Sequence, residues 1–341
     1  MGLYHTTGPS AGYLDWNYII DELGQGIVLC IGGRGTGKTY GVTDFHMDHG
    51  EEFLYLRRTL KMARIVRSAE FTPFKSYNDD HGTAILGYKI PDVEDMYILK
   101  DGDDGPTVGT ACALTTIANV RGIERPECRT LWYDEFIPET QVRKIADEGG
   151  ALMRAYESLN RNRELKGAPP MRLICTANAD ECVNPVFREL RLVRDAAEMQ
   201  RRGEEVRVYE QRHIALIVLK DSPISEAKSH TMIYEATAGT RTARMSIGNE
   251  FFTSAPSRYG RQNLREYLPR WSWGEISIYR HKSLRQWYVC ARRAGCEEYP
   301  DDDVGKLRLR RRHPEPWYAY LDNCVIFEDQ VSEEIFNDLY T

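Results

Sequence analysis

The first two thirds of the chain alternates short apolar runs with polar segments of helical spacing. The apolar runs have the length of single strands and lie at residues 27–31, 53–56, 110–120, 129–133, 171–177 and 213–219. Continuous apolar runs of this kind are typical of strands buried on both faces of a parallel sheet. Residues 85–98 have the pattern of a hairpin. The pattern predicts an α/β domain with a mostly parallel central sheet.

The pattern changes after residue 220. Residues 223–250 are rich in Ser, Thr, Ala and charged side chains, which predicts a linker with some helix. Apolar runs at 275–279 and 286–291 predict strands of a second, α+β domain, and residues 325–340 have the spacing of a closing amphipathic helix. We therefore predict a first domain at 1–222, a linker at 223–250 and a smaller domain at 251–341.

A glycine-rich stretch directly follows the first apolar run. It fits the pattern G-x-x-x-x-G-K-[ST] with Gly32, Gly33, Arg34, Gly35, Thr36, Gly37, Lys38 and Thr39. Between a strand and a helix, such a loop surrounds phosphates with backbone N–H groups, its lysine reaches the β- and γ-phosphates, and its last hydroxyl ligates Mg²⁺. A glycine-rich turn that matches by chance is the alternative, and the strand before the loop together with Lys38 and Thr39 at its end argues against it. We predict that residues 1–222 form a P-loop domain that binds ATP and Mg²⁺.

Two adjacent acids end the apolar run at residues 129–133. Asp134 and Glu135 stand where a Walker B strand carries its carboxylates. Asp134 would hold Mg²⁺ together with Thr39, and Glu135 would orient and polarise the attacking water. A strand that ends in Asp-Glu is a weak signal alone. Together with the P-loop, it predicts an ATP hydrolase of the additional-strand type.

Two more positions are candidates for catalysis. Asn178, or Thr176 as second choice, ends the apolar run at 171–177 and could sense the γ-phosphate, although a plain strand-end turn gives the same pattern. If a helix over 149–165 runs on to Arg163, Arg161 points away from its apolar stripe. An arginine that acts on a neighbouring subunit must point that way, but periodicity alone favours an ordinary solvated helix face.

Basic residues form two candidate DNA contacts. Arg57 and Arg58 end the apolar run at 53–56 and are followed by Lys61. Residues 306–312 alternate like a strand, which would place Lys306, Arg308, Arg310 and Arg312 on one face that could follow DNA phosphates. A solvated strand end and a charged edge strand are the respective alternatives.

Composition limits the partners and the location that the protein can have. The 341 residues carry a net charge of −6, so nucleic-acid binding requires local basic patches. Charged residues make up 28% of the chain, and we find neither a membrane-spanning apolar run nor a signal peptide. We therefore expect a protein that is not secreted and has no membrane partner. None of the eight cysteines forms a C-x-x-C pair, which favours buried, reduced thiols.

These motifs together resemble the DNA-encapsidation ATPases of phi29-like phages, which are additional-strand P-loop ATPases. The resembling stretches, in chain order, are residues 31–40, 53–58, 131–137, 160–164, 174–187, 245–251 and 320–339. The polar, helix-like stretch at 195–205 and the basic stretch at 306–312 depart from the family pattern. The resemblance therefore covers nearly the whole chain, with two local exceptions.

The resemblance implies a genome-packaging motor. Such a motor is a homo-oligomeric ring, thought to be a pentamer, that docks on the portal protein of an empty procapsid and drives double-stranded DNA inward with ATP. It implies that Arg161 acts in trans, that Arg34 touches the γ-phosphate, and that residues 251–341 form a ribonuclease-H-like domain without its metal-binding acids. It also suggests a structural packaging RNA as a partner. The location that it implies is the host cytoplasm and, transiently, the portal vertex of the procapsid.

Two rival functions remain open at this point. A helicase or recombination ATPase would share the motifs but prefer single-stranded DNA. A nucleotide-regulated assembly protein would need no lytic base, and the adjacent acids Asp134 and Glu135 argue against it.

Overall fold

A computed structural model describes most of the chain. The described residues are 2–7, 10–120, 127–138, 142, 144–178, 183–219, 223, 230–237, 259–322 and 324–340. They divide into two compact units, one made of Met1–Ile137 and Gly149–Phe251, the other of Pro138–Glu148 and Phe252–Thr341. The boundary between Phe251 and Phe252 lies at the end of the predicted linker. The assignment of Pro138–Glu148 to the second unit is a feature that the sequence did not predict.

The first unit is built on one large sheet. Among the described residues it has nine strands, in the order β3 (Ile85–Ile90), β4 (Val93–Asp101), β5 (Thr107–Ala113), β2 (Glu52–Arg57), β6 (Cys128–Asp134), β7 (Arg172–Ala177), β1 (Ile27–Ile31), β9 (Ile214–Val218) and β8 (Val206–Tyr209). All neighbours from β5 to β9 pair in parallel, whereas β3, β4 and β8 pair antiparallel. The predicted mostly parallel sheet, with its hairpin, is confirmed.

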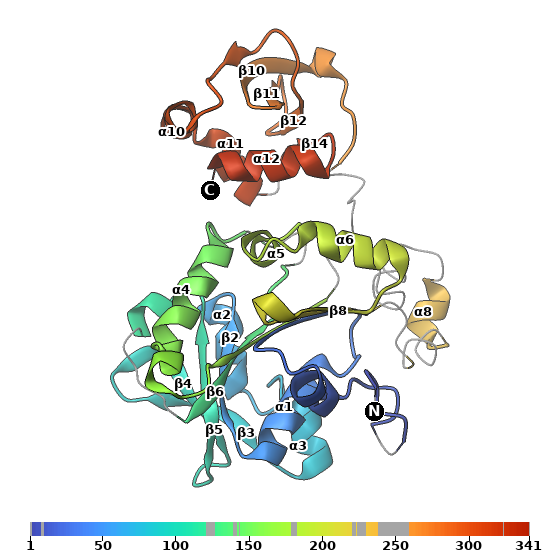
Figure 1. Ribbon diagram of the computed structural model, residues 1–341, viewed down its shortest axis with the longest axis vertical. Coiled ribbons are helices and arrows are strands. Elements are labelled where there is room, and N and C mark those ends of the chain that lie inside the picture. The colour runs from blue at the N-terminus through green and yellow to red at the C-terminus, as the bar shows by residue number, and fades with distance from the viewer. Residues whose placement is uncertain are drawn as a thin grey trace. The chain divides into compact units, whose positions relative to one another are not determined.

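Helices cover both faces of this sheet (Figure 1). One face carries α4 (Glu148–Asn160), α5 (Pro185–Glu189) and α6 (Val193–Arg202), and the other carries α1 (Lys38–His49) and α3 (Lys75–His81). Alternate strand residues supply the two cores: in β1, Leu29 and Ile31 face the α4 side, and Val28 and Cys30 face the α1 side. Burial on both faces explains why these strands are apolar throughout.

The second unit is smaller and has its own core. Its described residues form a mixed sheet in the order β13 (Glu297–Glu298), β10 (Tyr267–Trp273), β11 (Ile276–His281), β12 (Trp287–Ala291) and β14 (Val325–Phe327). The helices are α10 (Asp303–Arg312), α11 (Glu315–Leu321) and α12 (Gln330–Tyr340). Aromatic residues dominate the packing, with Tyr320, Phe327 and Phe336 in one cluster. This is an α+β unit, as predicted.

The basic strand predicted at 306–312 is wrong, because this stretch belongs to helix α10. The Asp302 carboxylate caps the helix by accepting the Gly305 N–H at 2.6 Å, and Leu309 is fully buried. On a helix, Lys306 and Arg310 lie one turn apart, as do Arg308 and Arg312, so the four side chains are split between two faces. They do not form the single phosphate-tracking face that a strand would present.

Two other boundaries differ from the prediction, and the predicted linker is described in part. Strand β5 ends at Ala113, and the 3₁₀ turn Ile117–Val120 follows it. Helix α4 ends at Asn160, where Arg161 and Asn162 adopt positive φ angles of 47° and 54°. Of the predicted linker 223–250, residues 223 and 230–237 are described, with α8 at Met232–Ala236. The rest of the linker, residues 179–182 of the resembling stretch 174–187, and the whole resembling stretch 245–251 lie outside the described residues.

The cysteines of the described residues are free thiols, as the sequence favoured. Cys30, Cys112, Cys128, Cys175 and Cys290 are buried, and Cys182 lies outside the described residues. Burial raises the pKa of the Cys30 thiol to about 12, so this thiol stays protonated. Within the described part of the chain, the helices are too short or too polar to cross a membrane.

The helical state of α10 can be tested through its cap. Asp302→Ala removes the carboxylate that accepts the Gly305 N–H, and we expect it to lower the free energy of unfolding by about 1 kcal/mol. Denaturant unfolding followed by tryptophan fluorescence measures this change. Asp301→Ala is the matched control, expected within about 0.5 kcal/mol of the parent protein. Equal losses for both variants would speak against the cap.

Candidate nucleotide-binding site

The glycine-rich stretch joins β1 to α1. Gly37 stands directly before the helix with a φ of 89°, which a residue with a Cβ adopts only under strain, and a Cβ there would also lie 3.1 Å from Tyr13 Cβ. A Cβ on Gly32 would lie 2.5 Å from the Leu219 side chain. The loop therefore needs glycine at both positions. Its backbone leads into the N-terminus of α1, where a helix favours a phosphate.

Lys38 is buried in this loop and folded back over it. Its Nζ donates hydrogen bonds to the carbonyl oxygens of Gly32 at 2.9 Å and Gly33 at 2.5 Å, and lies 3.3 Å from Thr36 Oγ1. These contacts fix the ammonium group inside the loop. A phosphate held by the loop would lie beside this charge.

The acids predicted as Walker B stand at the end of β6. Strand β7 pairs with both β6 and β1, so it lies between the acid-bearing strand and the P-loop strand. This order is that of the additional-strand type, as predicted. Glu135 follows β6 with a φ of 53°, an uncommon conformation for a residue other than glycine.

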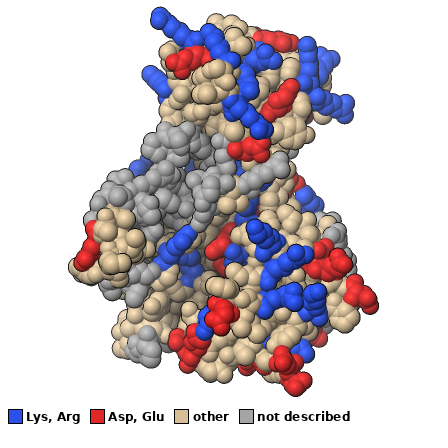
Figure 2. Space-filling view, turned by 180° about the vertical axis from the view of Figure 1, so that it is seen from behind, with Lys and Arg blue, Asp and Glu red and all other residues tan. Residues whose placement is uncertain are grey.

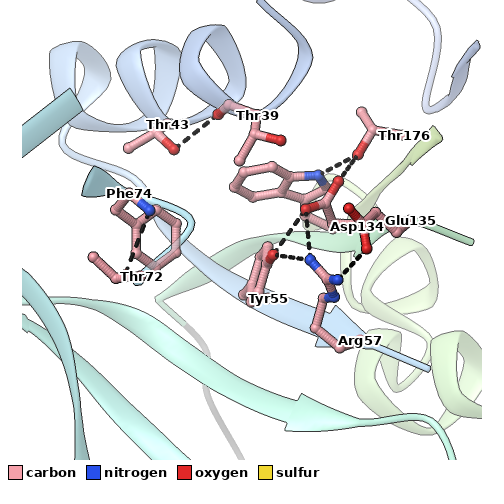
Figure 3. A network of polar contacts seen from close by, with 10 residues as sticks. Thr39, Thr43, Tyr55, Arg57, Thr72, Phe74, Asp134, Glu135 and Thr176 are labelled. Atoms are coloured by element: carbon pink, nitrogen blue, oxygen red, sulfur yellow. Dashed lines mark hydrogen bonds and ion pairs between the residues drawn. The ribbon is translucent and has the colours of Figure 1, made fainter. Parts of the chain in front are cut away.

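Asp134 is held by three donors from neighbouring strands (Figure 3). Its Oδ1 accepts from Thr176 Oγ1 at 2.7 Å, and its Oδ2 accepts from Tyr55 OH at 2.7 Å and from Arg57 at 3.2 Å. Thr176 also accepts the Trp132 indole N–H at 2.9 Å. Burial raises the pKa of Tyr55 well above its ordinary value, so its hydroxyl stays protonated and can donate. The carboxylate is therefore fixed in orientation.

Arg57 bridges the two acids. One of its terminal nitrogens contacts Asp134 and the other donates to Glu135, while the side chain is 10% exposed. Burial alone would disfavour the charged guanidinium, but Tyr55, Asp134 and Glu135 outweigh it and hold the pKa of Arg57 above its ordinary value. Figure 3 shows Arg57, Asp134 and Glu135 pointing toward one another.

A pocket of about 640 Å³ joins the P-loop to the acids. Its walls include Arg34, Gly35, Gly37, Lys38, Thr39, Asp134, Glu135 and Asn178, together with Tyr13, Tyr40 and Asp44. The volume lies within the range of small-molecule sites. The structure thus brings most of the predicted nucleotide, metal and catalytic residues to one cavity.

The two sensor candidates differ in position. Asn178 lines the pocket, whereas Thr176 is fully buried behind it and is occupied by Asp134 and Trp132. Arg161 is not among the residues that line this pocket, and it follows α4 in a turn of positive φ. The helix does not run on to Arg163, so the direction predicted for Arg161 from helical spacing does not apply.

The predicted DNA contacts at Arg57 and Arg58 need correction. Arg57 is the last residue of β2 and Arg58 follows it, and both residues are buried, with exposures of 8% and 0%. Neither presents its charge to a DNA surface. Lys61 is exposed at the start of the neighbouring turn, α2 (Leu60–Ala63).

Sequence reasoning missed the support that Tyr55, Arg57 and Trp132 give to the acids. Alternation along the strands contains the signal: Tyr55 and Arg57 share one face of β2, and Trp132 and Asp134 share one face of β6. The missing information was the pairing of β2 with β6, which brings these faces together.

Comparison with known proteins identifies the family of this chain. A family profile described as Podovirus DNA encapsidation protein (Gp16) matches residues 20–259. This chain belongs to that family. It is 30% identical over 228 residues to DNA packaging proteins of Bacillus phages PZA and phi29, a match that covers 65% of this chain and 60% of each relative. The chain thus spans less than two thirds of the length of these curated relatives.

Solved structures with the same fold include packaging motors. The Phi-28 gp11 DNA packaging motor has a TM-score of 0.55 at 17% identity, covering 95% of both chains. The bacteriophage Phi-29 genome packaging motor assembly has a TM-score of 0.51 at 16% identity, covering 99% of both chains. These likenesses support the fold of both units.

Because Thr176 makes two buried hydrogen bonds, we expect its hydroxyl to stabilise the fold. Thr176→Val keeps the shape of the side chain but removes its hydroxyl. The Asp134 carboxylate then loses a donor and the Trp132 N–H loses its acceptor. The free energy of unfolding should therefore fall by about 1.5–3 kcal/mol. Thr43→Val is the control, because that buried hydroxyl donates to a carbonyl of its own helix and its loss should cost about 1 kcal/mol or less. Denaturant unfolding of both variants measures the difference, and equal losses would contradict the assignment.

Proposed function

We propose that this protein is an ATP-hydrolysing motor that moves double-stranded DNA into an empty viral procapsid. The observation that carries the proposal is one pocket that contains the P-loop lysine and both Walker B acids, in a chain of the DNA encapsidation family. A nucleotide-regulated assembly protein would need the pocket but not Glu135. The family match lends no support to a helicase.

Mg²⁺ fits the oxygen groups of this pocket. The Thr39 hydroxyl and the Asp134 carboxylate both line it, and one or two such hard ligands together with substrate phosphates are the usual magnesium set. When bound, the ion would neutralise charge between the β- and γ-phosphates. Tyr55, Thr176 and Arg57 would hold the Asp134 carboxylate in one orientation for it.

The chain's own residues would divide the catalytic work. Lys38 would stabilise charge on the β- and γ-phosphates, and Arg34, which is exposed at the same loop, would add a second cation. Glu135 would position and polarise the attacking water, and Asn178 would hold that water or the γ-phosphate. Glu135 is 49% exposed toward solvent while Arg57 holds one of its oxygens. Release from Arg57 would therefore free this carboxylate to act as a base.

A second subunit would complete the site. Arg161 stands after α4 in a turn of two residues with positive φ, outside the residues that line its own pocket. We propose that it reaches the ATP of the neighbouring subunit in a homo-oligomeric ring, which the family resemblance suggests is a pentamer. An arginine supplied to the site in this way typically raises the rate of hydrolysis about 10³–10⁵-fold.

Duplex DNA and the portal protein are the proposed partners, in the host cytoplasm and at the portal vertex, with a packaging RNA as a further candidate. On the face shown in Figure 2, the Lys and Arg side chains of the described residues are interspersed with Asp and Glu. The candidate DNA contacts are local: exposed Lys61, Arg64 and Arg67 in the first unit, and the split faces of α10 with Lys306, Arg308, Arg310 and Arg312 in the second.

Mixed rings test this assignment. Arg161→Ala and Glu135→Gln should each bind ATP but lower steady-state turnover, by about 10³-fold or more for Arg161→Ala and about 10²–10⁴-fold for Glu135→Gln. Mixing the two before ring assembly should restore turnover, because one contributes the arginine and the other the glutamate.

Arg154→Ala is the control for this experiment, because it removes an exposed arginine from the same helix and should keep turnover near that of the parent. Absence of recovery at every mixing ratio would count against action in trans.

A further inference from the structure

The nucleotide pocket of the first unit has a wall that neither the triphosphate nor Mg²⁺ requires. Besides the P-loop and the Walker B acids, the pocket is lined by Tyr13 of the N-terminal segment, Tyr40 and Asp44 of α1, and Asp80 of α3. We call these four residues the tyrosine wall. The catalytic roles proposed above involve none of them, so their chemistry needs an account of its own.

Two hydrogen bonds hold the N-terminal segment against the P-loop. The Leu14 N–H donates to the Thr36 carbonyl at 3.1 Å, and the Trp16 indole N–H donates to the Gly37 carbonyl at 3.3 Å. Leu14 and Trp16 are both buried in the core on the α1 side of the sheet. Tyr13 directly precedes Leu14 and packs on the loop, where a Cβ on Gly37 would lie 3.1 Å from the Tyr13 Cβ. Tyr13 is therefore fixed beside the phosphate-binding loop.

Contacts with α3 fix the ring of Tyr40. Its hydroxyl lies 3.1 Å from His81 Nε2, and its ring packs edge-on against Tyr77 with 5.6 Å between the ring centres. Tyr77 in turn stacks on His81 at 4.1 Å. Burial and the nearby Asp80 carboxylate raise the pKa of Tyr40 to about 12, so the side chain stays neutral. Because Tyr40 directly follows the last P-loop residue, a rigid, uncharged ring stands next to the phosphate-binding loop.

Carboxylates make the tyrosine wall unsuited to phosphate. Asp44 lies one turn after Tyr40 on α1, with its Oδ1 3.8 Å from His81 Nε2, and Asp80 is close enough to Tyr40 to affect its pKa. Like charges repel, whereas a carboxylate accepts hydrogen bonds from hydroxyl and amine groups. At the Walker B acids, Mg²⁺ would offset such repulsion. The P-loop with Lys38 therefore suits the triphosphate, and the tyrosine wall suits an uncharged part of the ligand that carries donors.

We propose that the tyrosine wall binds the nucleoside of ATP. The rings of Tyr13 and Tyr40 contact the base, because every base has an apolar face that is favourable on an aromatic ring. The carboxylates of Asp44 and Asp80 accept hydrogen bonds from donors of the nucleoside. The inference rests on the proposed function for its ATP. It extends the assigned site from the triphosphate to the whole nucleotide.

Inorganic tripolyphosphate separates the two parts of the pocket, because it carries the triphosphate charge without a nucleoside. Calorimetry with the full chain and Mg²⁺ measures the Kd of tripolyphosphate and of a non-hydrolysable ATP analogue. The parent should bind the analogue at least about tenfold more tightly. Tyr13→Ala and Tyr40→Ala should each weaken analogue binding by about fivefold or more, which is typical for the loss of one aromatic contact with a base. Their affinity for tripolyphosphate should stay within about twofold of the parent.

Three further substitutions sharpen the test of the rings. Tyr13→Phe and Tyr40→Phe keep the aromatic ring and should recover most of the affinity for the analogue. Tyr88→Ala is the control, because it removes a half-buried tyrosine of β3 that is not among the residues lining this pocket, and it should bind both ligands like the parent.

Asp44→Asn tests the carboxylates and keeps the size of the side chain, so it carries the test even where an alanine variant fails to fold. It removes a charge that repels phosphate and weakens a hydrogen-bond acceptor. The preference for the analogue over tripolyphosphate should therefore fall by about threefold or more.

Each other outcome decides against the proposal. Equal losses of affinity for both ligands in the folded alanine variants would mean that the tyrosines only support the P-loop, and unchanged analogue binding would mean that they do not contact the nucleoside. An unchanged preference in Asp44→Asn would overturn the role of the carboxylates. A parent that binds both ligands equally would overturn this inference alone. A parent that binds neither would overturn the proposed function, and this inference with it.

Discussion

The site in the first unit depends on one buried guanidinium placed between two carboxylates. Asp134 and Glu135 are adjacent in sequence, and their charges would repel each other at the end of a buried strand. Arg57 contacts both, and Tyr55 supports the contact with Asp134. This arrangement is possible because β2 pairs with β6 in a register that sets Tyr55 beside Trp132, with Arg57 and Asp134 each two residues further along the same faces. The order of the strands therefore creates the acidic end of the pocket.

The same strand order also places the P-loop at the other end of the pocket. Strand β7 separates β6 from β1, so the P-loop and the Walker B acids meet across one strand, with Asn178 at the end of that strand. Parallel strands bring their carboxyl ends to one edge, which is where ligands bind in such sheets. The chemistry of hydrolysis needs these groups close together, and the strand order of the first unit brings them to one pocket.

The sequence predicted those parts of the fold and site that local patterns encode. The loop from Gly32 to Thr39 and the acids at 134 and 135 follow strands that are recognisable because burial on both faces keeps them apolar. The stretch 306–312 misled the prediction, since the alternation of basic residues and leucines fits a strand, and only the Asp302 cap and the packing of Leu309 decide for a helix. Arg57 was misassigned to DNA because its true partners lie on a strand far away in sequence.

The connection at Pro138–Glu148 could not have been predicted from local patterns either. Its place in the second unit depends on Lys144 meeting Tyr320 and Glu333, which lie far along the chain. Periodicity describes elements one at a time and contains no information about such pairs. Long-range side-chain contacts, rather than secondary structure, therefore tie this connection to the second unit.

The most direct test of the account is steady-state ATP hydrolysis by the full chain without DNA, with linear duplex, and with an equal mass of single-stranded DNA. A motor that moves double-stranded DNA should be stimulated chiefly by the duplex, and the stimulation should fall steeply with salt because phosphate contacts release counterions. Stimulation chiefly by single strands would contradict the account and favour a helicase.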